Sequence, residues 1–275
     1  MRILYSLVIL LVACPVLYGQ DSARLYLETG NRLKGEGNCQ EALIQYQRAV
    51  QLDPRLADGY VELAWCHNEL GQYALALQHL RTAEGLLPDN KRVLYETGFA
   101  WYHLDSADKA IRLFRQALAQ DSNYLLARIG MADVYRDKKN DSRTAITWYR
   151  TVISRDPNNK KAHYWAGWCH NELKEYTQAQ PYLQRVLSLD PDDRLAYSEL
   201  GYAAYSLKNF TDAISYLKKT ETLPGPRIET AMYYLGLCYT QTGQKQEAIK
   251  KYNELVLMES DLATGLLAEI RAMKQ

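Results

Sequence analysis

Small residues return along this chain at an almost constant interval, and a larger apolar residue follows each of them at a fixed distance. The small residues are Gly30, Ala64, Gly98, Ala132, Gly167, Gly201 and Gly236, so the spacing is 34 or 35 residues throughout. An alanine follows twelve residues after each, displaced by one in the fourth copy, and a large apolar side chain lies four residues beyond it. A small residue leaves room for the large side chain of a facing helix, so the pattern predicts closely crossing helices. Seven helical hairpins are expected.

Helix-breaking residues indicate where the hairpins end. Four copies close with proline, which cannot continue a helix because it lacks the backbone N–H: Pro54, Pro88, Pro157 and Pro191. The extra residue of the fourth copy falls in the polar run 136–141, where an insertion between helices is tolerated. We predict a repeat region over 22–260 with copies at about 23–56, 57–90, 91–124, 125–159, 160–193, 194–228 and 229–260.

These positions resemble the tetratricopeptide repeat (TPR) family. In the seventh copy the matching residues are Leu235, Gly236, Tyr239, Ala248 and Tyr252. In the first copy they are Tyr26, Gly30, Ala42, Tyr46, Ala49 and Pro54. The resemblance implies an all-α fold, an α-solenoid in which TPR hairpins form a right-handed superhelix and the first helix of each hairpin lines a concave groove.

A further helix is expected after the last copy. Apolar residues are spaced along one face of the segment 261–275 at Leu262, Leu266, Ile270 and Met273. An open stack of hairpins leaves its last helix pair uncovered, so we interpret this segment as a C-terminal capping helix.

The N-terminal segment is typical of an export signal. Arg2 is followed by an apolar run from Ile3 to Tyr18 and then by polar residues from Gln20, and Pro15 disfavours a membrane-spanning helix. Cleavage after Gly19 gives a signal peptide over 1–19. A lipobox at 11–14 is the alternative, with a lipoprotein signal over 1–13 and lipidation of Cys14. We favour Gly19, because the residues after Cys14 stay apolar, and expect an exported protein in the periplasm or the bacterial cell envelope, or alternatively an outer-membrane lipoprotein.

The charge balance narrows the class of partner. The chain has 33 Lys and Arg against 32 Asp and Glu, whereas nucleic-acid binders need a surplus of basic groups to neutralise phosphates. We therefore expect no nucleic-acid partner. No transmembrane span is expected after processing. The TPR resemblance implies a protein or peptide partner.

Two identical segments each contain adjacent cysteine and histidine residues, which could indicate a metal site or a catalytic site. Trp65-Cys66-His67-Asn68-Glu69-Leu70 recurs 103 residues later as 168–173. Adjacent side chains on a helix diverge by about 100°, and three repeats separate the two copies, so the Cys-His pairs are interpreted as core residues. No nucleotide, hydrolase or zinc motif occurs in the sequence. We predict no metal, no cofactor and no enzymatic activity.

The TPR resemblance places certain residues on the groove face. The residues predicted to bind the partner are Glu62, Trp65, Asn68, Glu96, Phe99, Tyr102, Tyr164, Trp165, Trp168, Asn171, Tyr202 and Tyr205. Packing of these aromatics on neighbouring repeats is the alternative, and a solvated face is the alternative for the ladder Glu28, Glu62 and Glu96.

The sequence therefore predicts a non-catalytic scaffold that binds a peptide or partner segment. Aromatic rings would bury apolar side chains of the ligand while the asparagines and glutamates fix its orientation. Trp65 and Trp168 would centre two similar subsites along one extended ligand. The alternative function is an outer-membrane-anchored lipoprotein that acts as an assembly factor for an envelope complex.

Overall fold

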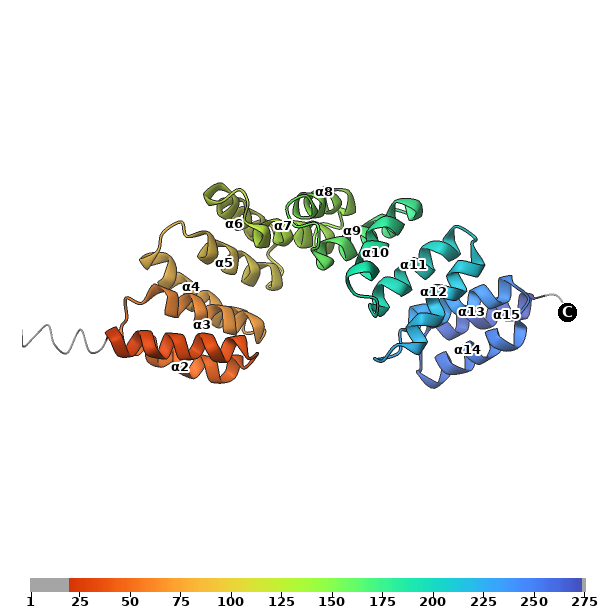
Figure 1. Ribbon diagram of the computed structural model, residues 1–275, viewed down its shortest axis with the longest axis horizontal. Helices are drawn as coiled ribbons and strands as arrows, with labels where there is room; N and C mark the ends of the chain where they lie inside the picture. The colour runs from red at the N-terminus through yellow and green to blue at the C-terminus, as the bar shows by residue number, and fades with distance from the viewer. Residues whose placement is uncertain (1–19, 274–275) are drawn as a thin grey trace, which may run out of the picture. The chain divides into compact units, whose positions relative to one another are not determined.

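A computed structural model describes residues 20–273, which are helical hairpins without any strand (Figure 1). The predicted signal segment and Cys14 lie outside the described residues, as do positions 274 and 275. The described chain divides between Lys139 and Asn140 into two compact units. The division falls inside the fourth copy, at the polar run that carries its extra residue.

The first unit contains three complete hairpins and the first helix of the fourth. Its helices are residues 20–35, α2 (Cys39–Leu52), α3 (Ala57–Glu69), α4 (Tyr73–Leu86), α5 (Lys91–His103), α6 (Ala107–Gln120) and α7 (Leu125–Asp137). Helix α3 packs on α4 and α5, and α5 packs on α6 and α7. Each first helix of a hairpin thus contacts its own second helix and the first helix of the next hairpin.

The second unit repeats this arrangement. Its helices are α8 (Ser142–Ile153), α9 (Lys160–Glu172), α10 (Tyr176–Leu189), α11 (Arg194–Ser206), α12 (Phe210–Thr222), α13 (Glu229–Gln241), α14 (Lys245–Leu257) and α15 (Leu262–Ala272). Helix α9 packs on α10 and α11, α11 on α12 and α13, and α13 on α14 and α15. The helical hairpins predicted from the 34-residue interval, and the all-α solenoid fold that the TPR resemblance implies, are confirmed.

The recurring small residues allow the close crossing that the sequence predicted. A Cβ atom on Gly98 would lie 2.7 Å from Cε1 of Phe114, and one on Gly201 would lie 2.4 Å from Cγ of Leu217. Both large side chains are almost fully buried. In four hairpins the recurring glycine and the large residue 16 positions later are therefore a packing pair: Gly30 with Tyr46, Gly98 with Phe114, Gly167 with Leu183 and Gly201 with Leu217.

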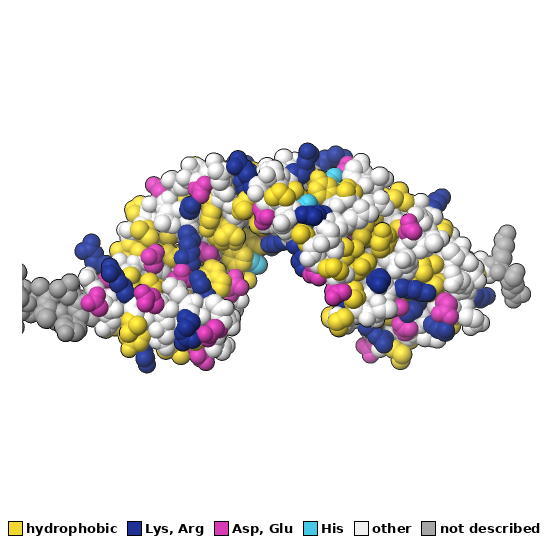
Figure 2. All heavy atoms as spheres, in the orientation of Figure 1, with side chains coloured by type: hydrophobic (Ala, Val, Ile, Leu, Met, Phe, Trp, Pro, Cys, Tyr) yellow, Lys and Arg dark blue, Asp and Glu magenta, His cyan; other side chains and the backbone are white. Residues whose placement is uncertain are grey.

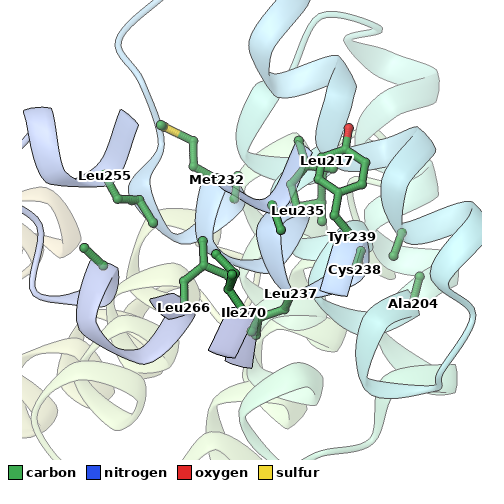
Figure 3. Close-up of a cluster of buried hydrophobic side chains, with 14 residues drawn as sticks. Ala204, Leu217, Met232, Leu235, Leu237, Cys238, Tyr239, Leu255, Leu266 and Ile270 are labelled. Atoms are coloured by element: carbon green, nitrogen blue, oxygen red, sulfur yellow. The ribbon is translucent and has the colours of Figure 1, made fainter. Parts of the chain in front are cut away.

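Helix α15 caps the last hairpin, as predicted. Leu266 is fully buried. It packs directly on Gly236, because a Cβ atom added to Gly236 would lie only 2.4 Å from Cδ2 of Leu266. Figure 3 shows Leu266 and Ile270 in the apolar cluster with Leu235 and Leu237. Burying these side chains drives the helix onto α13, because the stack would otherwise end in exposed apolar surface.

Candidate functional site

The first helix of each hairpin presents one face that carries the predicted binding residues, and we call it the A-helix face. In α3, Trp65, Asn68 and Glu69 are three and four residues apart, so they lie on neighbouring turns of one side. The same spacing recurs at Trp168, Asn171 and Glu172 of α9. All eight aromatic residues predicted to bind are partly exposed: Trp65, Phe99, Tyr102, Tyr164, Trp165, Trp168, Tyr202 and Tyr205.

Asn68 joins α3 to α5 through Glu96. Its Nδ2 donates to Oε2 of Glu96 at 2.9 Å and to the backbone carbonyl of the same residue at 3.2 Å. Both side chains are buried, at 3% and 4% exposed. Burial raises the pKa of the Glu96 carboxyl to about 7, against the hydrogen bond from Asn68 and the charge of Arg92. The Asn68 amide thus faces the next helix, and the carboxyl of Glu96 titrates near neutral pH.

Glu62, also placed on this face, is held by two basic side chains of its own unit. Lys34 Nζ and Arg92 Nη1 each lie 2.6 Å from one of its carboxylate oxygens. Burial opposes ionisation, but these two hydrogen bonds hold the pKa of Glu62 below its ordinary value. The predicted glutamate ladder is therefore uneven, because Glu28 is exposed while Glu62 and Glu96 are buried in different surroundings.

Aromatic rings border the Asn68 and Glu96 pair. Lys34 Nζ lies over the Trp65 ring at 4.7 Å from its centre. Tyr73 packs edge to face on Phe99 at 6.5 Å between ring centres and stacks on His103 at 4.6 Å. Trp65, Tyr73 and Phe99 are each partly buried and partly accessible.

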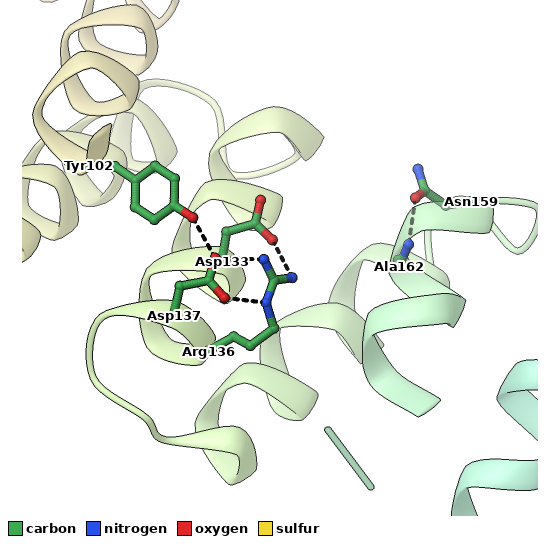
Figure 4. A network of polar contacts seen from close by, with 6 residues as sticks. All are labelled: Tyr102, Asp133, Arg136, Asp137, Asn159 and Ala162. Atoms are coloured by element: carbon green, nitrogen blue, oxygen red, sulfur yellow. Dashed lines mark hydrogen bonds and ion pairs between the residues drawn. The ribbon is translucent and has the colours of Figure 1, made fainter. Parts of the chain in front are cut away.

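Tyr102 belongs to a polar network at the far end of the first unit. Its hydroxyl donates to Asp137, which also accepts from Arg136 Nε at 2.5 Å (Figure 4). Arg136 Nη1 lies 3.0 Å from Asp133. These contacts fix the Tyr102 ring, and its pKa is raised by burial and by the Asp137 carboxylate.

The second unit reproduces the Asn68 and Glu96 pair at Asn171 and Glu199. Asn171 Nδ2 donates to Oε2 of Glu199 at 2.8 Å and to its backbone carbonyl at 3.1 Å. Burial and the neighbouring Glu172 raise the pKa of Glu199 to about 7 despite the Asn171 hydrogen bond. Asn171 is 1% exposed, but Glu199 is only partly buried. This carboxyl is therefore more accessible than that of Glu96.

The aromatic residues of the second unit form two groups. Trp165 packs edge to face on Tyr164 at 4.9 Å and on Trp168 at 5.8 Å between ring centres. Tyr202 packs on Tyr176 at 5.7 Å and on Tyr234 at 4.8 Å. Tyr205 also contacts Tyr234, at 5.2 Å. Tyr202 lies one turn from Glu199 on the same side of α11.

The two groups of residues are equivalent with an offset of 103 residues. Adding 103 to Trp65, Asn68, Tyr73, Glu96, Phe99 and Tyr102 gives Trp168, Asn171, Tyr176, Glu199, Tyr202 and Tyr205. We call them the first and second subsites. The sequence predictions omitted Glu199, Tyr73 and Tyr176. Extending the 103-residue offset beyond the identical six-residue segment would have found them.

The cysteines of the identical segments and His67 are buried, as the core interpretation predicted, whereas His170 is only partly buried. Cys66 and Cys169 are fully buried. His67 Nδ1 donates to Oε1 of Gln72 at 2.7 Å, and His170 Nδ1 donates to Oε2 of Glu175 at 2.8 Å. Within residues 20–273, no three His, Cys, Asp or Glu side chains lie close enough together to hold a metal ion.

The surface charges agree with the balanced composition. Figure 2 shows basic and acidic side chains interspersed over the visible face of each unit, with apolar areas between them. Among the described helices, none is long and apolar enough to cross a bilayer.

Comparison with sequence families matches three regions of the chain. Residues 20–152 match the model of the tetratricopeptide repeat protein 21 ARM repeat, 138–220 that of anaphase-promoting complex, cyclosome, subunit 3, and 230–257 that of the tetratricopeptide repeat. These matches support the tetratricopeptide repeat family for this chain. The repeat assignment made from the small and large residues agrees with them.

Known proteins show the same relationship. A TPR protein of Cytophaga hutchinsonii, known from its C-terminal part, is 19% identical with a TM-score of 0.66, and the match covers 88% of this chain and 99% of that one. One from Parabacteroides merdae is 14% identical with a TM-score of 0.61 over 91% and 99%. At these identities the likeness shows the TPR fold.

A curated relative matches over a shorter segment. The protein O-mannosyl-transferase Tmtc3 of Drosophila melanogaster is 30% identical over 130 residues, which are 42% of this chain and 14% of that protein. The chain spans about a quarter or less of the length of the curated relatives it matches. The transferase activity in that name belongs to that protein.

Proposed function

We propose that this chain is a non-catalytic protein-interaction scaffold that binds a peptide or partner segment on its A-helix face. The observation that carries the proposal is the pair of equivalent subsites. Each has a partly exposed tryptophan, a buried asparagine and a glutamate that accepts from it, buried in the first subsite and partly buried in the second. TPR proteins bind protein partners, and partly exposed aromatic side chains dominate the binding energy of many protein interfaces.

Each subsite combines the two features that peptide recognition needs. Its rings offer apolar area that a ligand side chain can cover, and fixed rings lose little conformational entropy on binding. The asparagine is anchored by two hydrogen bonds to the next helix, so the carboxyl beside it is held in one place. A ligand therefore meets a preorganised surface.

Recovery of the protein with its partner, followed by calorimetry, tests the proposal. The protein is isolated from its native envelope, bound partners are identified by mass spectrometry, and the identified partner is titrated into variants. Trp65→Ala and Trp168→Ala should each weaken binding by about 1 to 3 kcal/mol, and the double variant should bind almost nothing. Trp148→Ala, in α8 and outside the A-helix face, is the control. If the Trp65→Ala and Trp168→Ala variants fold correctly and bind normally, the binding site lies on another face of the protein.

Export to a bacterial envelope is part of the proposal. It rests on the signal pattern of residues 1–19, with release after Gly19 favoured over lipidation of Cys14. N-terminal sequencing of the native protein should begin at Gln20. Labelling with a palmitate analogue that depends on Cys14 would instead support the envelope-assembly lipoprotein.

A further inference from the structure

The two subsites differ at one equivalent position, which is basic in the first subsite and aliphatic in the second. In the first subsite Arg92 precedes Glu96 by one helical turn, and its charge lowers the pKa of that carboxyl. The residue equivalent to Arg92 in α11 is Leu195, whose side chain is 53% exposed. The chain thus supplies its own cation to the first subsite and an aliphatic residue at the same position in the second.

The acceptor groups of the second subsite lack a basic counterpart. Glu172 adds a like charge near Glu199, and within the described residues no Lys or Arg lowers the pKa of Glu199. Asn171 Oδ1 is buried and has no hydrogen-bond donor in residues 20–273, and the same holds for Asn68 Oδ1 in the first subsite, so the contrast between the subsites lies in Arg92 and Leu195. Because Oδ1 and Nδ2 share one carbon, this oxygen lies beside the carboxylate that accepts from Nδ2. A buried acceptor without a donor costs free energy, which a ligand that donates would recover.

Aromatic rings complete the surroundings of Glu199. Tyr202 is on the next turn of α11, and Tyr234 packs on Tyr202. Burial raises the pKa of Tyr234, and Glu199 is among the nearby acidic groups that add to this rise. Tyr176 meets Tyr202 edge to face from α10. Tyrosine rings attract cations through their faces and cover the aliphatic stem of a long basic side chain.

We propose that the second subsite binds a lysine or arginine side chain of a peptide segment, with Glu199 pairing with its charge and Tyr202 and Tyr234 covering its stem. The inference rests on the proposed function and names the chemistry of its ligand. Two carboxylates and one amide oxygen among tyrosine rings match an N–H donor with an apolar stem. The first subsite has its cation already and does not share this preference.

The proposal implies a pH dependence of binding. Only ionised Glu199 pairs with a cation, and burial raises its pKa to about 7, so affinity should rise as the pH increases from 6 to 8. The groups that face it are Asn171, which does not titrate, Glu172, and tyrosines whose phenols stay neutral in this range. The cation should displace the proton on binding.

Selection of dodecapeptides from a random phage library on the purified protein tests the inference. Selected peptides should be enriched in Lys or Arg, and replacing the enriched residue with norleucine or citrulline should weaken binding about tenfold or more. Glu199→Gln should cause a similar loss. So should Leu195→Arg, which installs the internal cation of the first subsite. Leu195→Ala is the matched control and should keep the affinity.

The outcomes separate this inference from the proposed function. Peptides that need Trp168 but show no basic preference, or that bind the Leu195→Arg variant as well as the parent protein, would overturn the cation assignment and leave the scaffold function standing. Absence of any selected peptide that depends on Trp168 would overturn both. Thermal melts of each variant identify any loss of binding that comes from unfolding.

Discussion

The Asn68 amide donates to Glu96 at 2.9 Å between two successive first helices, in a place where neither side chain is more than 4% exposed. This hydrogen bond crosses from one hairpin to the next, so it contributes to the stacking of the unit. It also holds a carboxyl group away from water. The carboxyl is neutral in acid and carries a buried charge in base.

Glu96→Gln should therefore stabilise the protein in base and leave it unchanged in acid. The folded-state pKa of about 7 exceeds the unfolded value of about 4.5, so stability is fully present below 4.5 and is lost as the pH rises through 7. Glutamine keeps the acceptor for Asn68 without the charge. We expect a gain on the order of 1 to 3 kcal/mol at pH 8 and none at pH 4, measured by urea unfolding. Equal effects at both pH values would contradict a buried ionising carboxyl.

Glu62→Gln should show the opposite pH dependence. Lys34 and Arg92 lower the folded-state pKa of Glu62, so its stabilisation is present above about 4.5 and is lost as the pH falls through the folded value. We expect a loss of about 1 to 3 kcal/mol at pH 7, because the variant leaves two basic side chains without their shared carboxylate. The loss should shrink at pH 3. Asp108→Asn, which removes an exposed pair with Lys139, serves as the control and should change little.

The contrast between Glu62 and Glu96 shows what the sequence could and could not predict. The 34-residue interval follows from packing between neighbours in one dimension, so the hairpins, the buried Cys66 and the capping helix could all be predicted from it. The interval also placed the two glutamates in equivalent positions. Their charge environments differ because Lys34 comes from the first helix of the preceding hairpin and Arg92 from the first helix of the following hairpin. The repeat pattern carries no information on those side chains.

Glu199 was not predicted, because its role also depends on side chains of a neighbouring helix. Its repeat position carries glutamate in four copies, but Gly130 and Trp165 interrupt the ladder between Glu96 and Glu199. Asn171 lies 28 residues before Glu199, and the pairing depends on how α9 and α11 pack side by side. The division at Lys139 was likewise unforeseen, since the added residue in the loop was expected only to lengthen a connection between helices.

The turn between the two helices of a hairpin offers a stabilising substitution. Seven positions after the recurring small residue, the backbone is left-handed. In the second unit this position is Lys174, with φ of 59°, and Lys208, with φ of 61°. In the first unit Gly71 has the same conformation, with φ of 71°. A side chain disfavours this conformation. Lys208→Gly should raise stability by about 1 kcal/mol, seen as a higher melting temperature. Gln184→Gly, on the exposed side of α10, should lower it by a similar amount, because glycine weakens a helix interior.

The packing of Gly201 on Leu217 gives a prediction with its own rescue. An added Cβ at residue 201 would lie 2.4 Å from Cγ and 2.5 Å from Cδ2 of Leu217, which is fully buried against it. Gly201→Ala should therefore cost about 1 to 3 kcal/mol, since a crowded core forces side chains off their rotamers. Leu217→Ala alone should cost about 2 to 5 kcal/mol through the cavity it leaves. If the two residues form one packing pair, the double variant should be more stable than the sum of the single losses predicts, because the new methyl group fills part of the cavity. Urea unfolding of the four proteins measures this coupling, and simple additivity would show that α11 and α12 adjust to the added methyl by moving apart.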